Sequence, residues 1–174
     1  MGFSEIEQLF KEELVELCHI YAKNWLALDG VWFQSIEAKH GLAEALEHDA
    51  NAWRRFTEIE ARRIKQFLKL PERAGLEGLK KALSLRLYAT LNKDEITMEG
   101  NTLLYKVIGC RVQQARNRKG MAYHPCKPVG ILEYTYFAKV IDDRLQTQCI
   151  SCHPDITDPS CNCIWQFTLV EKEE

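Results

Sequence analysis

The sequence predicts a single α+β domain of 174 residues, in which long N-terminal helices are followed by a small antiparallel sheet with one helix inserted. Apolar residues recur every three or four positions from Ser4 to about Leu70, the spacing of one face of a helix. Strand patterns begin only after Thr90, and the last segment alternates with a period of two. We therefore expect a helical part over residues 1–90 and a cysteine-rich sheet part over residues 91–174 of one domain.

The first helix is expected to be long. Its apolar spacing continues in phase through the Asp29-Gly30 pair, and the His40-Gly41 pair then ends it. The apolar stripe consists of Leu14, Cys18, Tyr21, Trp25, Leu28, Trp32 and Ile36.

Two more helices complete the helical part. One is expected from about Leu42 to Leu70, because Pro71 lacks the backbone N–H needed to continue it. A shorter helix is expected roughly from Leu76 to Leu87.

The sheet part begins with a β-hairpin. Residues 95–98 and 102–112 are rich in strand-forming residues and are separated by a short turn that contains Gly100. Residues 130–141 return to helical spacing, and residues 144–150 are expected to form another strand.

Six of the seven cysteines lie in the last 65 residues, which indicates a metal site. Cys149 and Cys152 form a Cys-x-x-Cys pair, and tetrahedral zinc needs two further ligands. Cys126 upstream and Cys163 downstream can supply them. Cys161 is the alternative to Cys163, because residues two apart on a strand share a face. With four thiolates the zinc would be structural, since no position stays open for water.

Other uses of these thiols are an iron–sulfur cluster, free or redox-active cysteines, or disulfides; His124 or His153 could also replace one thiol. Disulfides need an oxidising compartment, and the N-terminal residues contain no secretory signal pattern. The sequence therefore favours a cytoplasmic protein with zinc as its cofactor.

Composition argues against two classes of partner. The net charge of −2 and pI near 6.2 give no basic surface for nucleic acid, and no apolar run approaches the ~20 residues that span a membrane. The stripe on the first helix offers a face for a homodimer, although burial in the core explains it equally well.

Six segments resemble an uncharacterised family of bacterial and archaeal cytosolic proteins, which is similar to the 2-aminothiazoline-4-carboxylate hydrolase-like proteins. These segments are NWLALDGVWF, EARRIK, CRVQQARNRKG, HPCKPVG, FAKVIDDR and CISCHPD…CNCIWQF.

The chain more distantly resembles the 4-vinyl-reductase small-ligand-binding domain. In that family zinc is held by a cysteine, an acidic residue some two dozen positions later, a cysteine three residues further, and a cysteine that opens the last strand. Cys126, Cys149, Cys152 and Cys163 occupy these places here, with Cys149 replacing the acid. The resemblance implies a zinc-stabilised domain that binds a small molecule between helices and sheet. The first resemblance implies an alternative, a hydrolase acting on a small heterocyclic or amide carboxylate.

Asp29 is the first candidate for such a ligand site. Trp25 and Trp32 lie one helical turn before and after it, so two indoles would desolvate the carboxylate and raise its pKa. All three residues are candidates for ligand contact, and Asp29 is also a candidate general acid or base. The alternative is that Asp29 caps a helix that resumes after Gly30.

Glu60 and Cys110 are further catalytic candidates. Glu60 lies among apolar helix neighbours, but an ion pair with Arg63 or Arg111 explains it as well. Cys110 lies outside the proposed zinc ligands and could act as a nucleophile if its pKa were lowered.

Arg111 and Gln113 are expected to share one face of the second hairpin strand, where a guanidinium group could bind a substrate carboxylate. The alternative is a charged edge that protects the hairpin from pairing with other chains.

Overall fold

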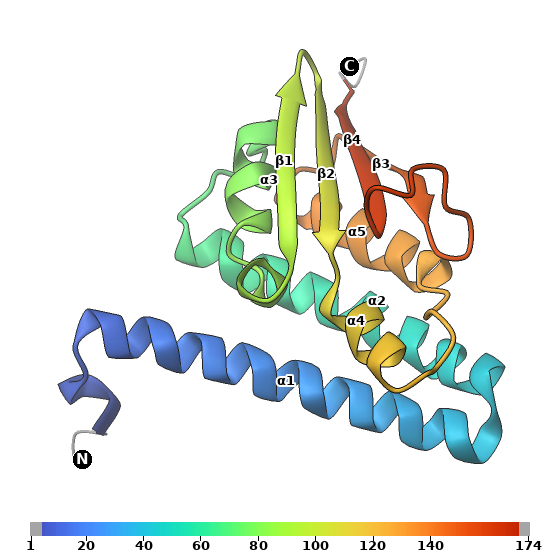
Figure 1. Ribbon diagram of the computed structural model, residues 1–174. Coiled ribbons are helices and arrows are strands. Elements are labelled where there is room, and N and C mark those ends of the chain that lie inside the picture. Colours follow the sequence, from blue (N-terminus) through green and yellow to red (C-terminus); the bar gives the residue numbers. More distant parts are fainter. Residues whose placement is uncertain (1–4, 171–174) are drawn as a thin grey trace.

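The computed structural model describes residues 5–170, and it confirms the predicted α+β class (Figure 1). Ser4, where the predicted helical pattern begins, lies outside this range. The helices within it are η1 (Glu5–Gln8), α1 (Lys11–His40), α2 (Leu42–Phe67), α3 (Gly75–Leu83), η2 (Leu87–Thr90), α4 (Arg111–Arg118) and α5 (Lys127–Ile141). The strands are β1 (Lys93–Glu99), β2 (Thr102–Gly109), β3 (Leu145–Cys152) and β4 (Cys163–Leu169).

The four strands form one antiparallel sheet in the order β1-β2-β4-β3. The last strand of the chain is therefore inserted between the hairpin and β3. Helix α5 covers one face of this sheet, α2 packs behind α5, and α1 runs along the outside of the helical layer (Figure 1).

Helix α1 is continuous through Asp29 and Gly30, as the apolar spacing predicts. The chain then turns sharply at Gly41, whose φ of 90° lies in the region that favours glycine. The Gly41 N–H donates to the Glu37 carbonyl at 2.9 Å and closes the helix end. Helix α2 ends at Phe67, three residues before the predicted end.

The prediction that the second hairpin strand reaches residue 112 is wrong. β2 ends at Gly109 and α4 begins at Arg111. At this point two asparagine side chains replace the neighbouring strand as hydrogen-bond acceptors for the backbone. Asn162 Oδ1 accepts from the Cys110 N–H at 2.8 Å, and Asn92 Oδ1 accepts from the Arg111 N–H at 3.0 Å. Both asparagines are distant in sequence from the residues that they bind. The local sequence of β2 therefore does not show where the strand ends.

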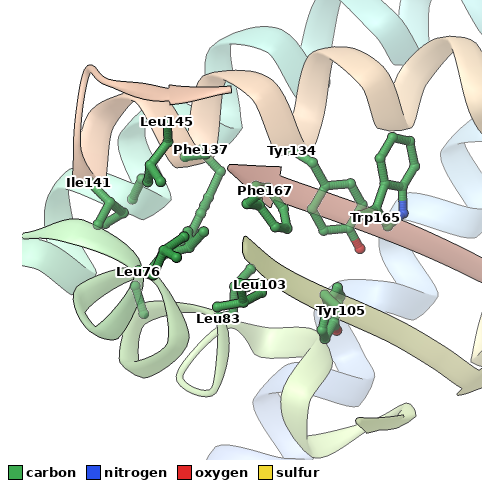
Figure 2. Packing of buried hydrophobic residues seen from close by; sticks show 14 of the residues in the cluster. Leu76, Leu83, Leu103, Tyr105, Tyr134, Phe137, Ile141, Leu145, Trp165 and Phe167 are labelled. Carbon is green, nitrogen blue, oxygen red and sulfur yellow. The ribbon is translucent and has the colours of Figure 1, made fainter. Parts of the chain in front are cut away.

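The core lies between the sheet and helices α3 and α5 (Figure 2). The alternation along β2 directs Leu103, Tyr105 and Val107 to the helical side, where all three are buried. Trp165 and Phe167 of β4 lie in the same cluster. Burying one large apolar side chain of this kind contributes about 1.5–3 kcal/mol.

Among the described residues, every helix is either too short or too polar to traverse a lipid bilayer.

Candidate functional site

A cavity of about 370 Å³ lies between the α1–α2 helix pair on one side and α4, α5 and the sheet on the other. Its walls are mainly apolar, with a few ionisable side chains and thiols among them. This volume and this mixture are typical of small-molecule sites.

Helix α4 closes part of the cavity because Arg116 anchors it to α1. Its guanidinium group donates to both carboxylate oxygens of Glu37, at 2.8 and 2.9 Å, and to the Ala122 carbonyl at 2.7 Å. The hydrogen bonds from Arg116 lower the Glu37 pKa, so the pair stays charged.

The structure brings four of the predicted zinc ligands together. Cys126 lies at the N-terminus of α5, and its Sγ is 3.5 Å from the Sγ of Cys152 at the end of β3. Cys149 and Cys163 also make side-chain hydrogen bonds with Cys152. We call these four residues the thiol cluster. Three of them, all except Cys149, line the cavity, so cluster and cavity share a wall.

A β-bulge explains how Cys149 and Cys152 reach the same place. Residues three apart on a regular strand point to opposite faces. Here the register with β4 shifts between Cys149 and Ser151, and the inserted residue redirects the strand. Cys152 then pairs directly with Cys163 across the sheet.

The donor set fits zinc in its chemistry, since four thiolates are the ligands of a common type of structural zinc site. Four sulfurs around tetrahedral zinc lie about 3.8 Å from one another, close to the 3.5 Å separation of Cys126 and Cys152. The three other thiols each form a hydrogen bond with Cys152, however, as thiols without a bound ion do. Accordingly, within residues 5–170 no group of three or more Cys, His, Asp or Glu side chains is already arranged to hold a metal ion.

Protonation within the thiol cluster is uneven. A hydrogen bond from Cys152 lowers the pKa of Cys126 to about 7 against the opposing effect of burial, and nearby His124 lowers it further. The Cys149 pKa is lowered by the same kind of bond, whereas the Cys152 pKa is raised because this residue is the donor. Thiolate is the form that binds metals, and Cys126 is thus partly in this form at neutral pH.

Cys161, the alternative to Cys163, lies outside the thiol cluster. β4 begins only at Cys163, so the two cysteines do not share a strand face as predicted. Cys161 is buried, and its thiol donates to the Asp158 carbonyl at 3.6 Å.

Asp29 lies in the cavity wall, but its neighbours differ from the prediction. Burial raises its pKa to about 6, the nearby Asp49 carboxylate raises it further, and His124 lowers it. Asp49 itself is 3.6 Å from His124 Nε2. Asp29, Asp49 and His124 therefore form a group of titratable side chains on the helical side of the cavity.

The predicted indole environment of Asp29 is wrong. Trp25 packs against Trp53 and Phe56 of α2, with ring centroids 5.6 and 5.1 Å apart, and does not line the cavity. Trp32 is exposed, because one turn beyond Asp29 its side chain lies off the face that α2 covers.

Gln113 and Arg111 both line the cavity, but from helix α4 and not from a strand. The Gln113 side chain is buried and holds the segment before α5: Oε1 accepts from the His124 N–H and Nε2 donates to the His124 carbonyl, both at 2.9 Å. Nε2 also contacts Cys126 Sγ at 3.6 Å. Gln113 thus positions His124 and Cys126 and has little hydrogen-bonding capacity left for a ligand.

Glu60 lies in the core outside the cavity, which does not fit its proposed catalytic role. It pairs with Arg86 at 2.8 Å, and neither Arg63 nor Arg111 is its partner. The Arg86 guanidinium group also pairs with Glu133 at 2.7 Å. All three side chains are almost fully buried.

Cys110 lines the cavity, yet burial raises its pKa to about 12. Little thiolate forms at neutral pH, so the lowered pKa that a nucleophile needs is absent.

Asp49 and Glu133 are cavity residues that the sequence reasoning missed. Each lies four residues from apolar neighbours on both sides: Asp49 between Ala45 and Trp53, and Glu133 between Val129 and Phe137. An acidic residue in the middle of an apolar helix face is the sequence pattern from which both could have been predicted. Burial raises the Glu133 pKa to about 7, although Arg86 opposes this effect.

The fold and site thus define an α+β domain with a cavity whose wall includes three members of the thiol cluster. Residues 7–169 match the family of unknown function DUF6125, and the chain belongs to this family. No curated protein matches the chain.

Proposed function

We propose that the protein is a cytoplasmic, zinc-stabilised domain that binds a small molecule. The observation that carries the proposal is the cavity of about 370 Å³ with thiols and titratable groups in its apolar wall. The cytoplasmic location follows from the same thiols, because metal binding requires them to be reduced and reducing compartments keep them so.

The cavity favours a ligand with an apolar body and a hydrogen-bond donor at one end. Val107, Val129 and Tyr134 supply apolar wall on the sheet side. Asp29 and Asp49 supply carboxylates on the helical side, where burial removes part of their hydration. A ligand N–H or ammonium group would replace that lost hydration with a direct hydrogen bond.

Cys126, Cys149, Cys152 and Cys163 would hold the zinc. Bound there, zinc would supply a cross-link among the start of α5, the end of β3 and the start of β4. The adjoining cavity wall depends on these same segments, so the geometry of the cavity would depend on the metal.

The second candidate function is hydrolysis of a small heterocyclic or amide carboxylate, favoured by the pKa of about 6 at Asp29. In its ionised form Asp29 would accept a proton from an attacking water. Arg111, half-buried in the same wall, would bind the substrate carboxylate.

A thermal-shift screen of the full-length zinc-loaded protein tests ligand binding, with aromatic amines, aromatic carboxylates and neutral aromatics as probes. Ala115→Phe should fill the cavity, since Ala115 lines it, whereas Gln114→Phe changes an exposed neighbour on the same helix. Probes should stabilise the wild type and Gln114→Phe but not Ala115→Phe. Equal shifts in both variants, or no shift with any probe class, would overturn the proposal.

Compounds that bind should then be incubated with the protein and examined for ring or amide opening by mass spectrometry. Hydrolysis by the wild type that is lost in Asp29→Asn would support the second candidate. Binding without turnover would leave the protein as a binding domain and exclude hydrolysis of those compounds.

A further inference from the structure

Helix α1 carries an exposed apolar stripe, which shares Leu14, Tyr21 and Leu28 with the stripe predicted from the sequence. Its positions alternate in steps of three and four, the repeat of a helix that packs along another helix. They are Leu14, Leu17, Tyr21, Asn24, Leu28 and Val31, and Phe10 continues the repeat at the N-terminal end of the helix. We call these seven residues the α1 seam.

Most of the α1 seam is open to solvent. Tyr21 is 55% exposed, Leu28 68% and Val31 65%, and Trp32 beside the seam is 69% exposed. Of the 30 residues in α1, only Ala22 and Phe33 are buried. Figure 1 shows the reason: helices α2 to α5 and the sheet all lie on one side of α1.

We infer that the α1 seam is the contact surface for a second copy of this chain, with the two α1 helices packed along each other. The same patch would lie on both sides of a two-fold axis, as closed symmetric dimers require.

The exposed aromatic side chains alone supply a large part of the area that such a dimer buries. Phe10, Tyr21 and Trp32 are 75%, 55% and 69% exposed, so at about 200 Å² per aromatic side chain they offer about 400 Å² in each copy. That is about half of the roughly 800 Å² that each partner buries in a standard interface. Leu14, Leu28 and Val31, all exposed, add to it.

The composition of α1 favours a second helix over a membrane surface. Asn24 places one amide within the seam, and a single polar residue at such a position fixes the register of paired helices. Helices that lie on membranes carry Lys and Arg on their polar face. The first turns of α1 instead carry Glu12, Glu13 and Glu16.

The dimer interface would also border the cavity. Val31 belongs to the α1 seam and lines the cavity. Lys23, an exposed residue of the same helix outside the seam, lines the cavity too. The inference itself needs neither ligand nor zinc, so it stands or fails independently of the proposed function.

Sedimentation velocity over a concentration series tests the inference on the full chain. The wild type should have twice the 20.2 kDa chain mass. Leu28→Glu should be monomeric, or raise the dissociation constant at least a hundredfold, because it places a charge in the seam. The matched control is Val15→Glu, which changes an exposed apolar residue of α1 outside the seam and should leave the dimer intact.

Leu28 and Val15 are both exposed, so circular dichroism should show the same helix content in both variants; Leu28→Ser serves as a milder seam variant if Leu28→Glu misfolds. A monomeric wild type at all concentrations would overturn the inference. So would a dimer that survives both Leu28 variants, or a monomer that cosediments with phosphatidylglycerol vesicles through this face.

Discussion

The edge of the Trp165 indole lies against the backbone of Gly130. A Cβ atom at position 130 would stand 2.6 Å from the indole Cζ2 and 2.9 Å from Cη2, which is too close for any side chain. The absence of a side chain thus lets α5 approach the sheet. The Gly130 N–H also donates to the Cys126 carbonyl at 2.8 Å, so this approach fixes the end of α5 that carries the thiol.

Gly130→Ala should therefore destabilise the protein by about 1–3 kcal/mol, because the methyl group must displace a fully buried ring. Urea denaturation measures the change in the free energy of unfolding. The control is Gly30→Ala in the middle of α1, where nothing lies within 4 Å of the new methyl group; it should stabilise by about 0.5–1 kcal/mol. If Gly130→Ala were as stable as the wild type, the close packing described here would be contradicted.

The Arg86 ion pairs should contribute more to the free energy of unfolding than an ion pair on the surface does. Arg86→Met leaves the Glu60 and Glu133 carboxylates buried without their shared cation, and breaking a buried pair in this way costs about 3–5 kcal/mol. Arg62→Met removes an exposed pair with Glu58 on α2 and should cost about 0.5 kcal/mol or less. Equal losses for the two variants in chemical denaturation would contradict the role given to Arg86.

The sequence predicts those features that depend on local periodicity. The length of α1 follows from spacing that stays in phase through Gly30, and the hairpin follows from strand-forming residues on both sides of Gly100. The end of β2 was missed because it depends on the side chains of Asn92 and Asn162, which meet this strand only in the folded chain.

The candidate site likewise combines features that the local sequence predicts with features that depend on contacts in the folded chain. Spacing selected Cys126, Cys149 and Cys152 but left Cys161 and Cys163 as alternatives, because the bulge after Cys149 and the start of β4 at Cys163 depend on strand pairing. The neighbours of Asp29 could not be predicted, because they come from α2 and from the segment before α5. Whether the thiols bind zinc stays a prediction.

Metal analysis should find one zinc ion per chain in protein purified without chelators, by plasma mass spectrometry. Cys152→Ser should lose it, because Cys152 contacts the other three thiols. The control is Cys161→Ser, which changes a buried cysteine outside the thiol cluster and should retain the metal. Iron in place of zinc, or equal metal content in the two variants, would contradict the assignment.

Chelation should lower stability for the same reason. Removing the ion breaks a link among three segments, so the melting temperature should fall and should recover when zinc is returned. Cys152→Ser should show no response to either treatment. If the melting temperature of the wild type changed neither on chelation nor on return of zinc, the thiol cluster would hold no structural metal.

The last prediction concerns Asp142, which joins the end of α5 to α3 and β3. Burial opposes its ionisation, but hydrogen bonds from Arg144 and from the Gly75 N–H outweigh that effect and lower the Asp142 pKa from 3.8 to about 2. A carboxylate with a lowered pKa in the folded state contributes stability that is complete above the unfolded pKa and is lost as the pH falls towards the folded one. The shift corresponds to about 2 kcal/mol at pH 7, of which about half should remain at pH 3. Asp142→Asn should thus lower the free energy of unfolding at pH 7, and urea titrations should find a clearly smaller difference from the wild type at pH 3. Glu44→Gln, which alters an exposed pair with His48, should cause little change at either pH. A loss at Asp142 that is independent of pH would mean that its packing, and not its charge, holds the three elements together.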